Sequence, residues 1–275
     1  MPELPEVELI RRHLAPVVDG ATVIDVAVSH ERTARYNSGP EEVEQRLNAR
    51  TFTSLARTGK FLHSELDDGQ VVVAHLGMSG RFVVDGDDEP HTHFRCRFDN
   101  GHEIRFIDPR TFGFVAVCDQ DAPLPGMLRL GADAWTTPPE PSRLAAMLQK
   151  RTAAIKALLL DQALISGLGN IYADEALHRA RIHPLRPGGD LTDGETKRLL
   201  DAISVVLESA IDNGGTSLDD LAYLLPDGRA GENLGRLRVY GRTDQPCLTC
   251  GTPIEQVRVR ARSTHFCPNC QAAGK

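Results

Sequence analysis

Two C-x2-C pairs near the C-terminus constrain the fold of this chain more than any other feature. They are Cys247 with Cys250 and Cys267 with Cys270, and sixteen residues separate the pairs. This spacing is typical of a four-cysteine zinc site, in which each pair gives two thiolates to a tetrahedral ion. Because protein sulfur then fills every ligand position, we expect one structural Zn²⁺ in a short β-type zinc finger over 236–275.

The segment between the two pairs is basic. Arg258, Arg260 and Arg262 stand at every second position, and on a β-hairpin they would project from one face. Such an edge could read phosphates, or it could be a solvated basic strand. The net charge of −7 argues weakly against nucleic acid, yet residues 231–275 hold seven basic and three acidic side chains.

The N-terminal part reads as one helix followed by short strands. Val7, Ile10, Leu14 and Val17 fall at helical spacing, so a helix begins at Pro5 or Glu6. Alternating apolar residues and Gly-containing turns then predict a β-sandwich. Its expected strands are Thr22–Val28, Phe61–Leu66, Gln70–Leu76, Arg81–Val84, Phe94–Asp99 and His102–Ile107.

The chain is expected to fold as an α+β protein with three parts. Residues 1–118 form the N-terminal helix and β-sandwich, in which the isolated Cys96 and Cys118 are core residues. Residues 119–142, with five prolines, form a linker. Residues 143–235 are helical, with a tight turn around Gly167 and Gly169, and residues 236–275 form the zinc finger.

The first residues carry a possible nucleophile. Removal of Met1 would leave the secondary amine of Pro2 at the start of a helix, with Glu3 beside it to move protons. The positive end of the helix dipole favours the neutral, reactive amine. The same residues also read simply as an acidic helix start, and the N-terminal segment alone favours that reading.

Five motifs occur in order along the chain, at 2–6, 75–80, 108–113, 167–172 and 247–270. They begin with Pro-Glu-Leu-Pro-Glu and include His-Leu-Gly-Met-Ser-Gly, Asp-Pro-Arg-Thr-Phe-Gly and Gly-Leu-Gly-Asn-Ile-Tyr. In this order the chain resembles the formamidopyrimidine-DNA glycosylase (Fpg/Nei) family over nearly its full length. The resemblance implies a helix–two-turns–helix motif in the helical part and base excision repair as the activity.

The resemblance also assigns roles near the N-terminus. Pro2 would attack C1′ of a damaged nucleotide, and its iminium would act as an electron sink for β- and δ-elimination. Glu3 would serve as the acid and base, with Glu6 as a second carboxylate nearby. Lys60 would contact the phosphate beside the lesion.

Further residues match the family's DNA contacts. Asn170 would hold the DNA backbone in the two-turn motif, and Arg262 would grip phosphates from the zinc hairpin. His75 and His91 would touch phosphate or would simply pack. The void left by a flipped base would be filled by the family's triad, which corresponds here to Met78, Arg110 and Phe112; core packing is the alternative for Met78 and Phe112.

The start of the chain and the intact triad favour the branch that removes oxidised purines, namely 8-oxoguanine and formamidopyrimidines. The alternatives are the endonuclease VIII branch, which removes oxidised pyrimidines, a damage-binding protein without catalysis, and a zinc-stabilised interaction module.

Two departures from the family's sequence pattern bear on the substrate. Residues 227–235, taken as the loop over the flipped base, carry Glu232 and Asn233 where relatives often have aromatics, and Thr111 replaces a common second arginine.

Damaged double-stranded DNA is the expected partner. The acidic N-terminus does not read as a secretory signal, and no apolar stretch reaches membrane length. We therefore expect a cytoplasmic monomer with no membrane association.

Overall fold

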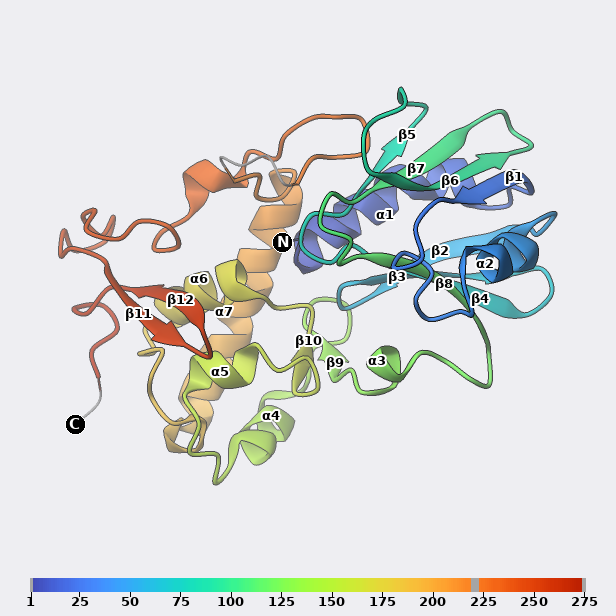
Figure 1. The fold of residues 1–275 in the computed structure, drawn as a ribbon. Coiled ribbons are helices and arrows are strands. Elements are labelled where there is room, and N and C mark those ends of the chain that lie inside the picture. Colours follow the sequence, from blue (N-terminus) through green and yellow to red (C-terminus); the bar gives the residue numbers. More distant parts are fainter. Residues whose placement is uncertain (1, 219–222, 274–275) are drawn as a thin grey trace. The chain divides into compact units, whose positions relative to one another are not determined.

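The structure is a computed structural model that describes residues 2–218 and 223–273 (Figure 1). By its contacts the chain forms two compact units. The first is Met1–Leu128 with Ile211–Leu234, and the second is Arg129–Ala210 with Gly235–Lys275. The division at 118, 142 and 235 stays a prediction, and the contacts differ from it in grouping 211–234 with the N-terminal residues.

The first unit contains two antiparallel four-stranded sheets, in the strand orders β1-β6-β7-β5 and β2-β3-β4-β8. The ring of Phe52 on β2 meets that of Phe98 on β6 edge-on, with 5.5 Å between centroids, so the sheets face each other as a sandwich. The strands are β1 (Val23–Val28), β2 (Phe52–Thr58), β3 (Phe61–Leu66), β4 (Gln70–His75), β5 (Arg81–Val84), β6 (Thr92–Phe98), β7 (Glu103–Ile107) and β8 (Phe114–Asp119).

Helices α1 (Leu4–Val18), α2 (Pro40–Leu47) and α3 (Pro125–Leu128) complete this unit. Helix α1 packs on β2 and β3 because its apolar residues recur every three or four positions. Leu4, Val7, Ile10 and Leu14 are almost fully buried along that stripe. Pro5 sits in the first turn, where no intrahelical N–H is required.

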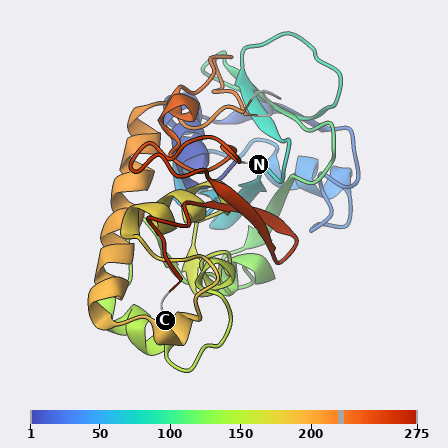
Figure 2. The same cartoon turned by 90° about the vertical axis from the view of Figure 1, so that its left-hand side faces the viewer.

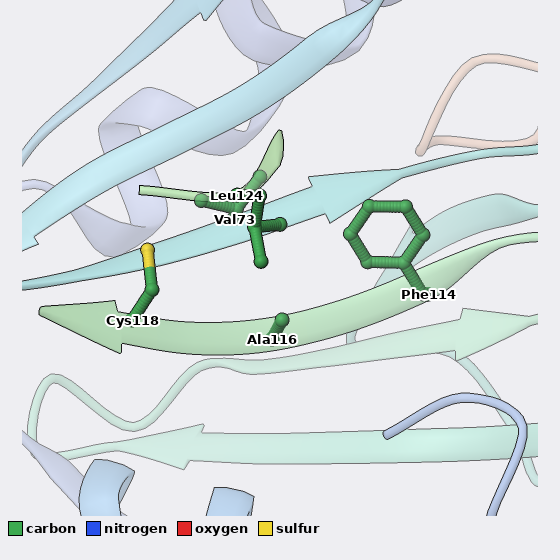
Figure 3. Packing of buried hydrophobic residues seen from close by; sticks show 5 residues of the cluster. All are labelled: Val73, Phe114, Ala116, Cys118 and Leu124. Carbon is green, nitrogen blue, oxygen red and sulfur yellow. The ribbon is translucent and has the colours of Figure 1, made fainter. Parts of the chain in front are cut away.

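One face of the β2-β3-β4-β8 sheet carries its own apolar cluster. Figure 3 shows Val73 of β4 beside Phe114, Ala116 and Cys118 of β8, covered by Leu124. Cys118 therefore serves as a small core residue, and Cys96 of β6 is likewise fully buried. Both cysteines play the packing role expected from the sequence.

The second unit is mainly helical and ends in the β11–β12 hairpin, drawn in dark red in Figure 2. Its elements are β9 (Ala132–Asp133), α4 (Pro141–Leu148), α5 (Ile155–Leu159), β10 (Ile165–Ser166), α6 (Asn170–Ala180), η1 (Gly188–Asp190), α7 (Asp193–Asp212), η2 (Asn233–Arg236), β11 (Glu255–Val259) and β12 (Arg262–Phe266). The last residues of α7 and the first residues of η2 belong to the first unit by their contacts. Among the described residues, none of the helices is both long and apolar enough to cross a membrane.

The hairpin corrects one expectation about its arginines. Val259 pairs with Arg262, so Arg260 and Ala261 form a two-residue turn in which both have positive φ, 46° and 58°. Arg258 pairs with Ser263, one position further along the ladder. Arg258 and Arg262 therefore lie on opposite faces, and the prediction of three arginines on one face is wrong because the chain reverses between them.

Candidate active site and zinc centre

Two buried carboxylates, those of Glu3 and Glu6, lie shortly after Pro2 in the chain. Glu3 is the N-cap of α1, and its side chain accepts the backbone N–H of Glu6. In return a Glu6 carboxylate oxygen accepts the Glu3 N–H at 2.9 Å, which completes a capping box. Glu3 is 2% exposed and Glu6 is 1% exposed. The fold thus holds two acid groups in fixed positions beside the predicted nucleophile.

Glu6 also reaches a segment far away in sequence. Its Oε1 accepts the backbone N–H of Thr216 at 2.9 Å. The approach requires glycine at the preceding position, since Gly215 has φ +80° and a Cβ there would lie 3.1 Å from Oε1. Burial, with the charge of Glu6 nearby, raises the pKa of Tyr223, which donates to the carbonyl of Gly214.

Lys60 stands in the turn between β2 and β3 and is 8% exposed. Arg57 holds this turn by donating to the carbonyl of Gly59 at 2.9 Å and to Glu8 of α1 at 3.3 Å. Burial acts to raise the pKa of Glu8, but hydrogen bonds and charge from its neighbouring arginines outweigh it, so the pKa is lowered. A buried ion pair thus fixes the turn that carries Lys60.

His75 lies within the electrostatic reach of Lys60. Burial, with the charges of Lys60 and Arg35, lowers the pKa of His75 to about 4. Its Nδ1 accepts the N–H of Gly77 at 3.0 Å, which leaves the proton of the neutral ring on Nε2. His75 is therefore a neutral donor at pH 7 rather than a cation.

A single carboxylate ties together the turns that carry the predicted triad. Asp108 is fully buried and accepts Ser79 Oγ at 2.5 Å and the Gly113 N–H at 2.6 Å. Ser79 follows the half-buried Met78, and Gly113 follows Phe112. The structure therefore brings Met78, Arg110 and Phe112 onto two linked turns.

The two turns also touch directly. Gly77 has φ +61°, and a Cβ at this position would lie 2.5 Å from the backbone nitrogen of Gly113. Arg35 supports the second turn by donating to the carbonyls of Phe112 at 2.8 Å and Gly113 at 2.6 Å. Phe112 itself is 39% exposed beneath the guanidinium of Arg110, 4.8 Å from the ring centroid.

His91 borders the same turns. It is exposed, has φ +68°, and its carbonyl accepts the Asp108 N–H at 3.0 Å. Sequence reasoning missed Asp108 and Arg35 as organisers of these turns. Asp108 stood inside a recognised motif and could have been found there, whereas Arg35 has no local signal because its partners lie 77 and 78 residues away.

In the second unit the structure brings Asn170 and Arg262 together. Asn170 is the first residue of α6, and its amide nitrogen donates to the carbonyl of Ser263 at 2.9 Å. Ser263 follows the exposed Arg262 on β12. A polar turn at a helix N-terminus and an arginine therefore stand side by side, which suits phosphate binding.

A fully buried ion pair anchors this arrangement and was not foreseen. Lys156 donates to Asp174 at 2.6 Å and to the carbonyl of Asn170 at 2.7 Å. The other oxygen of Asp174 accepts the N–H of His265 on β12 at 3.0 Å. One buried pair thus joins the helical turn to the zinc hairpin.

The four predicted zinc ligands converge. The Sγ atoms of Cys247, Cys250, Cys267 and Cys270 all lie within 4.8 Å of one another. Two of the separations are 3.9 Å and 3.4 Å, and a tetrahedral ion with Zn–S bonds of about 2.3 Å requires about 3.8 Å. The residues therefore fit Zn²⁺ with no position left for water, so the metal is structural.

Family models match almost the whole chain. The formamidopyrimidine-DNA glycosylase N-terminal domain matches residues 1–115, its H2TH domain 130–221, and the zinc finger found in FPG and IleRS 244–273. The formamidopyrimidine-DNA glycosylase of Salinispora arenicola is 43% identical over 98% of this chain and 96% of its own length. The chain belongs to the formamidopyrimidine-DNA glycosylase family.

Solved structures of family members share the fold. A Lactococcus lactis FPG variant in complex with Fapy-dG-containing DNA has 34% identity and a TM-score of 0.90, covering 99% of this chain and all of that one. The wild-type L. lactis FPG with oxidized-pyrimidine-containing DNA gives 0.89 at the same identity and coverage. The predicted fold class, structural zinc and enzyme class, a DNA glycosylase of base excision repair, are confirmed.

Proposed function

We propose that this glycosylase excises oxidised purines from duplex DNA and then cleaves the strand, with Pro2 as the nucleophile. The observation that carries the proposal is the capping box of Glu3 and Glu6 directly behind Pro2. It holds proton-transfer groups, both buried, within the first turn of the helix that begins beside the amine. A protein that only binds damage has no need of a free N-terminal proline amine beside these groups.

The chemistry follows from a secondary amine. The Pro2 nitrogen forms a bond to C1′ while the bond from C1′ to the damaged base breaks, and the base leaves with a proton. Glu3 moves a proton to the ring oxygen as the sugar opens, giving an iminium. Loss of a C2′ proton then expels the 3′ phosphate, and a second elimination expels the 5′ phosphate.

We assign DNA contacts to residues on both units. Lys60 and the neutral Nε2–H of His75 would donate to phosphate beside the lesion, and His91 would donate further along the strand. Asn170 and Arg262 would hold the backbone, with the exposed Arg262 supplying charge. These assignments are supported by the placement of each group in or next to a turn between elements, as with Lys60 between β2 and β3 and Arg262 at the start of β12.

Met78, Arg110 and Phe112 would occupy the space left by the flipped nucleotide. Arg110 would donate to the acceptors of the orphaned cytosine, and Phe112 would wedge between bases. The exposure of Phe112, rare for a phenylalanine with a core available, supports this role over simple packing.

The loop at 227–235 bears on lesion choice. Asn233 is buried, and its side chain donates to Thr216 Oγ1 at 2.9 Å, while Glu232 is exposed. We assign Asn233 a structural role in closing this loop onto the 213–217 segment. Oxidised pyrimidines remain a second substrate class, which the L. lactis complex with such a lesion favours.

A competition assay tests the substrate class. One labelled duplex carries 8-oxoguanine opposite cytosine, and a second carries an oxidised pyrimidine, mixed at equal concentration. We expect faster cleavage of the first, with phosphate on both new ends. Preference for the second would place the enzyme in the other branch.

We further propose that the protein works in the cytoplasm as a monomer. Light scattering with and without DNA would test whether it is a monomer.

A further inference from the structure

Among the described residues of the first unit, two arginines have no hydrogen-bond acceptor for their guanidinium groups. Within residues 2–128, 211–218 and 223–234, each other arginine binds a carboxylate or, for Arg35, backbone carbonyls. Arg32 and Arg110 have no such hydrogen bond or ion pair and are exposed.

Both of these guanidiniums lie against the same side chain. The Cζ atom of Arg110 is 4.8 Å from the centroid of Phe112, and that of Arg32 is 6.0 Å from it. A cation–π contact at an exposed site contributes only about 0.5–1 kcal/mol. The stacking therefore orients the two cations but leaves their hydrogen-bonding capacity open to an anion.

Arg35 fixes the turn that carries Arg32 together with the turn that carries Phe112. A single Arg35 nitrogen, Nη1, donates to the carbonyl of Arg32 at 2.6 Å and to that of Gly113 at 2.6 Å. The turn that carries Arg32 is thereby joined to the turn that carries Phe112. Any nucleic acid that meets Phe112 would meet Arg32 as well.

Position 111, next to Phe112, carries an uncharged side chain. Thr111 stands there in the left-handed region with φ +54°. Arg32 supplies, from a segment about eighty residues earlier, a cation next to Phe112 that position 111 does not provide.

We propose that Arg32 binds a DNA backbone phosphate next to the base step that receives Phe112, replacing the charge absent at Thr111. Arg32 is then a substrate-contacting residue that works beside Arg110. The inference rests on the proposed function, since it requires duplex DNA to lie over Phe112.

The test measures binding of a duplex with a tetrahydrofuran abasic analogue by fluorescence anisotropy between 50 and 300 mM KCl. Arg32→Gln should weaken binding about five- to tenfold at 0.1 M salt and reduce the slope of log Kd against log salt by about 0.9, the value for one phosphate contact. Arg32→Lys should keep most of the slope. The matched control is Arg97→Gln, which removes an exposed arginine paired with Asp25 and should match the wild type.

A second variant tests the compensation. Adding Thr111→Arg to Arg32→Gln should restore the slope, because it returns a cation beside Phe112. Equal weakening at every salt concentration would overturn the proposal, since it would show that Arg32 only supports the Phe112 ring. Unchanged binding of Arg32→Gln would also overturn it. Failure of the wild type to bind would instead overturn the proposed function.

Discussion

Glu6 and Thr216 are 210 residues apart, yet a Glu6 carboxylate oxygen accepts the Thr216 backbone N–H at 2.9 Å. The other Glu6 oxygen accepts the N–H of Glu3. One buried carboxylate therefore sets the geometry both of the helix start behind Pro2 and of the segment that follows α7. A substitution at Glu6 should consequently disturb catalysis and the loop after α7 together.

Asp108 should control the void-filling turns. Asp108→Ala removes the acceptor for the half-buried Ser79 hydroxyl and for the buried Gly113 N–H, and a buried donor left unsatisfied costs about 1–3 kcal/mol. We expect a lower unfolding midpoint in urea and weaker binding to the tetrahydrofuran duplex. Asp99→Ala, an exposed control, should change both far less. Unchanged binding by Asp108→Ala would show that these turns do not depend on the carboxylate.

The ion pairs of Glu8 with Arg11, Arg12 and Arg57 should make stability depend on acid pH. Because the folded pKa of Glu8 is lowered, its contribution is fully present above the unfolded pKa of about 4.5 and is lost as pH falls through the folded value. Glu8→Gln removes the negative charge that faces the buried Arg57 guanidinium, at a cost of about 3–5 kcal/mol at pH 7. Urea midpoints measured from pH 3 to 7 should therefore vary less with pH in this variant. A pH profile parallel to the wild type would contradict the assignment.

Breaking the pair of Lys156 and Asp174 should loosen the DNA site that we propose in the second unit. Asp174→Ala removes the carboxylate that faces the fully buried Lys156 ammonium and that accepts the N–H of His265, so we expect a loss of about 3–5 kcal/mol. Hydrogen exchange should rise in both α6 and β12. Exchange confined to one of these elements would show that the pair does not couple them.

Removing the metal should unfold the finger without damaging the sandwich. A strong chelator should release one Zn²⁺ per chain, reported by a colorimetric zinc dye, with loss of DNA binding. Cys250→Ser should lower the bound zinc, whereas Cys118→Ala, in the sandwich core, should retain one equivalent. Full DNA affinity in the zinc-free protein would show that the hairpin does not contribute to binding.

Much of this fold follows from local sequence signals. A Gly-containing turn between the expected strands Phe94–Asp99 and His102–Ile107 predicted the β6–β7 hairpin, and in the structure the Phe98 N–H donates a hydrogen bond to the His102 carbonyl across this turn. Helix α1 and the zinc ligands were likewise readable from spacing. Strand β2 was missed because its register shifts between Phe52 and Leu55, which breaks the two-residue alternation on which such predictions depend.

The organising residues of the site were harder to predict. Arg35 acts through carbonyls on a distant turn, and Lys156 through Asp174 on another helix, so neither has a sequence neighbour that reveals its role. The prediction of three arginines on one face was wrong because the two-residue turn at Arg260 and Ala261 contains no glycine, so nothing in the sequence indicates that the chain reverses there. Local periodicity reports elements, whereas these contacts arise only once the elements have packed.

Trapping with borohydride tests the central claim most directly. The protein, with Met1 shown by intact mass to be removed, is incubated with a duplex that carries 8-oxoguanine opposite cytosine, and borohydride reduces any iminium to a stable bond. We predict a covalent adduct that maps to Pro2 and is absent from a folded Pro2→Gly variant that still binds the duplex. An adduct of equal yield in Pro2→Gly, or none in the wild type despite tight binding, would contradict Pro2 as the nucleophile.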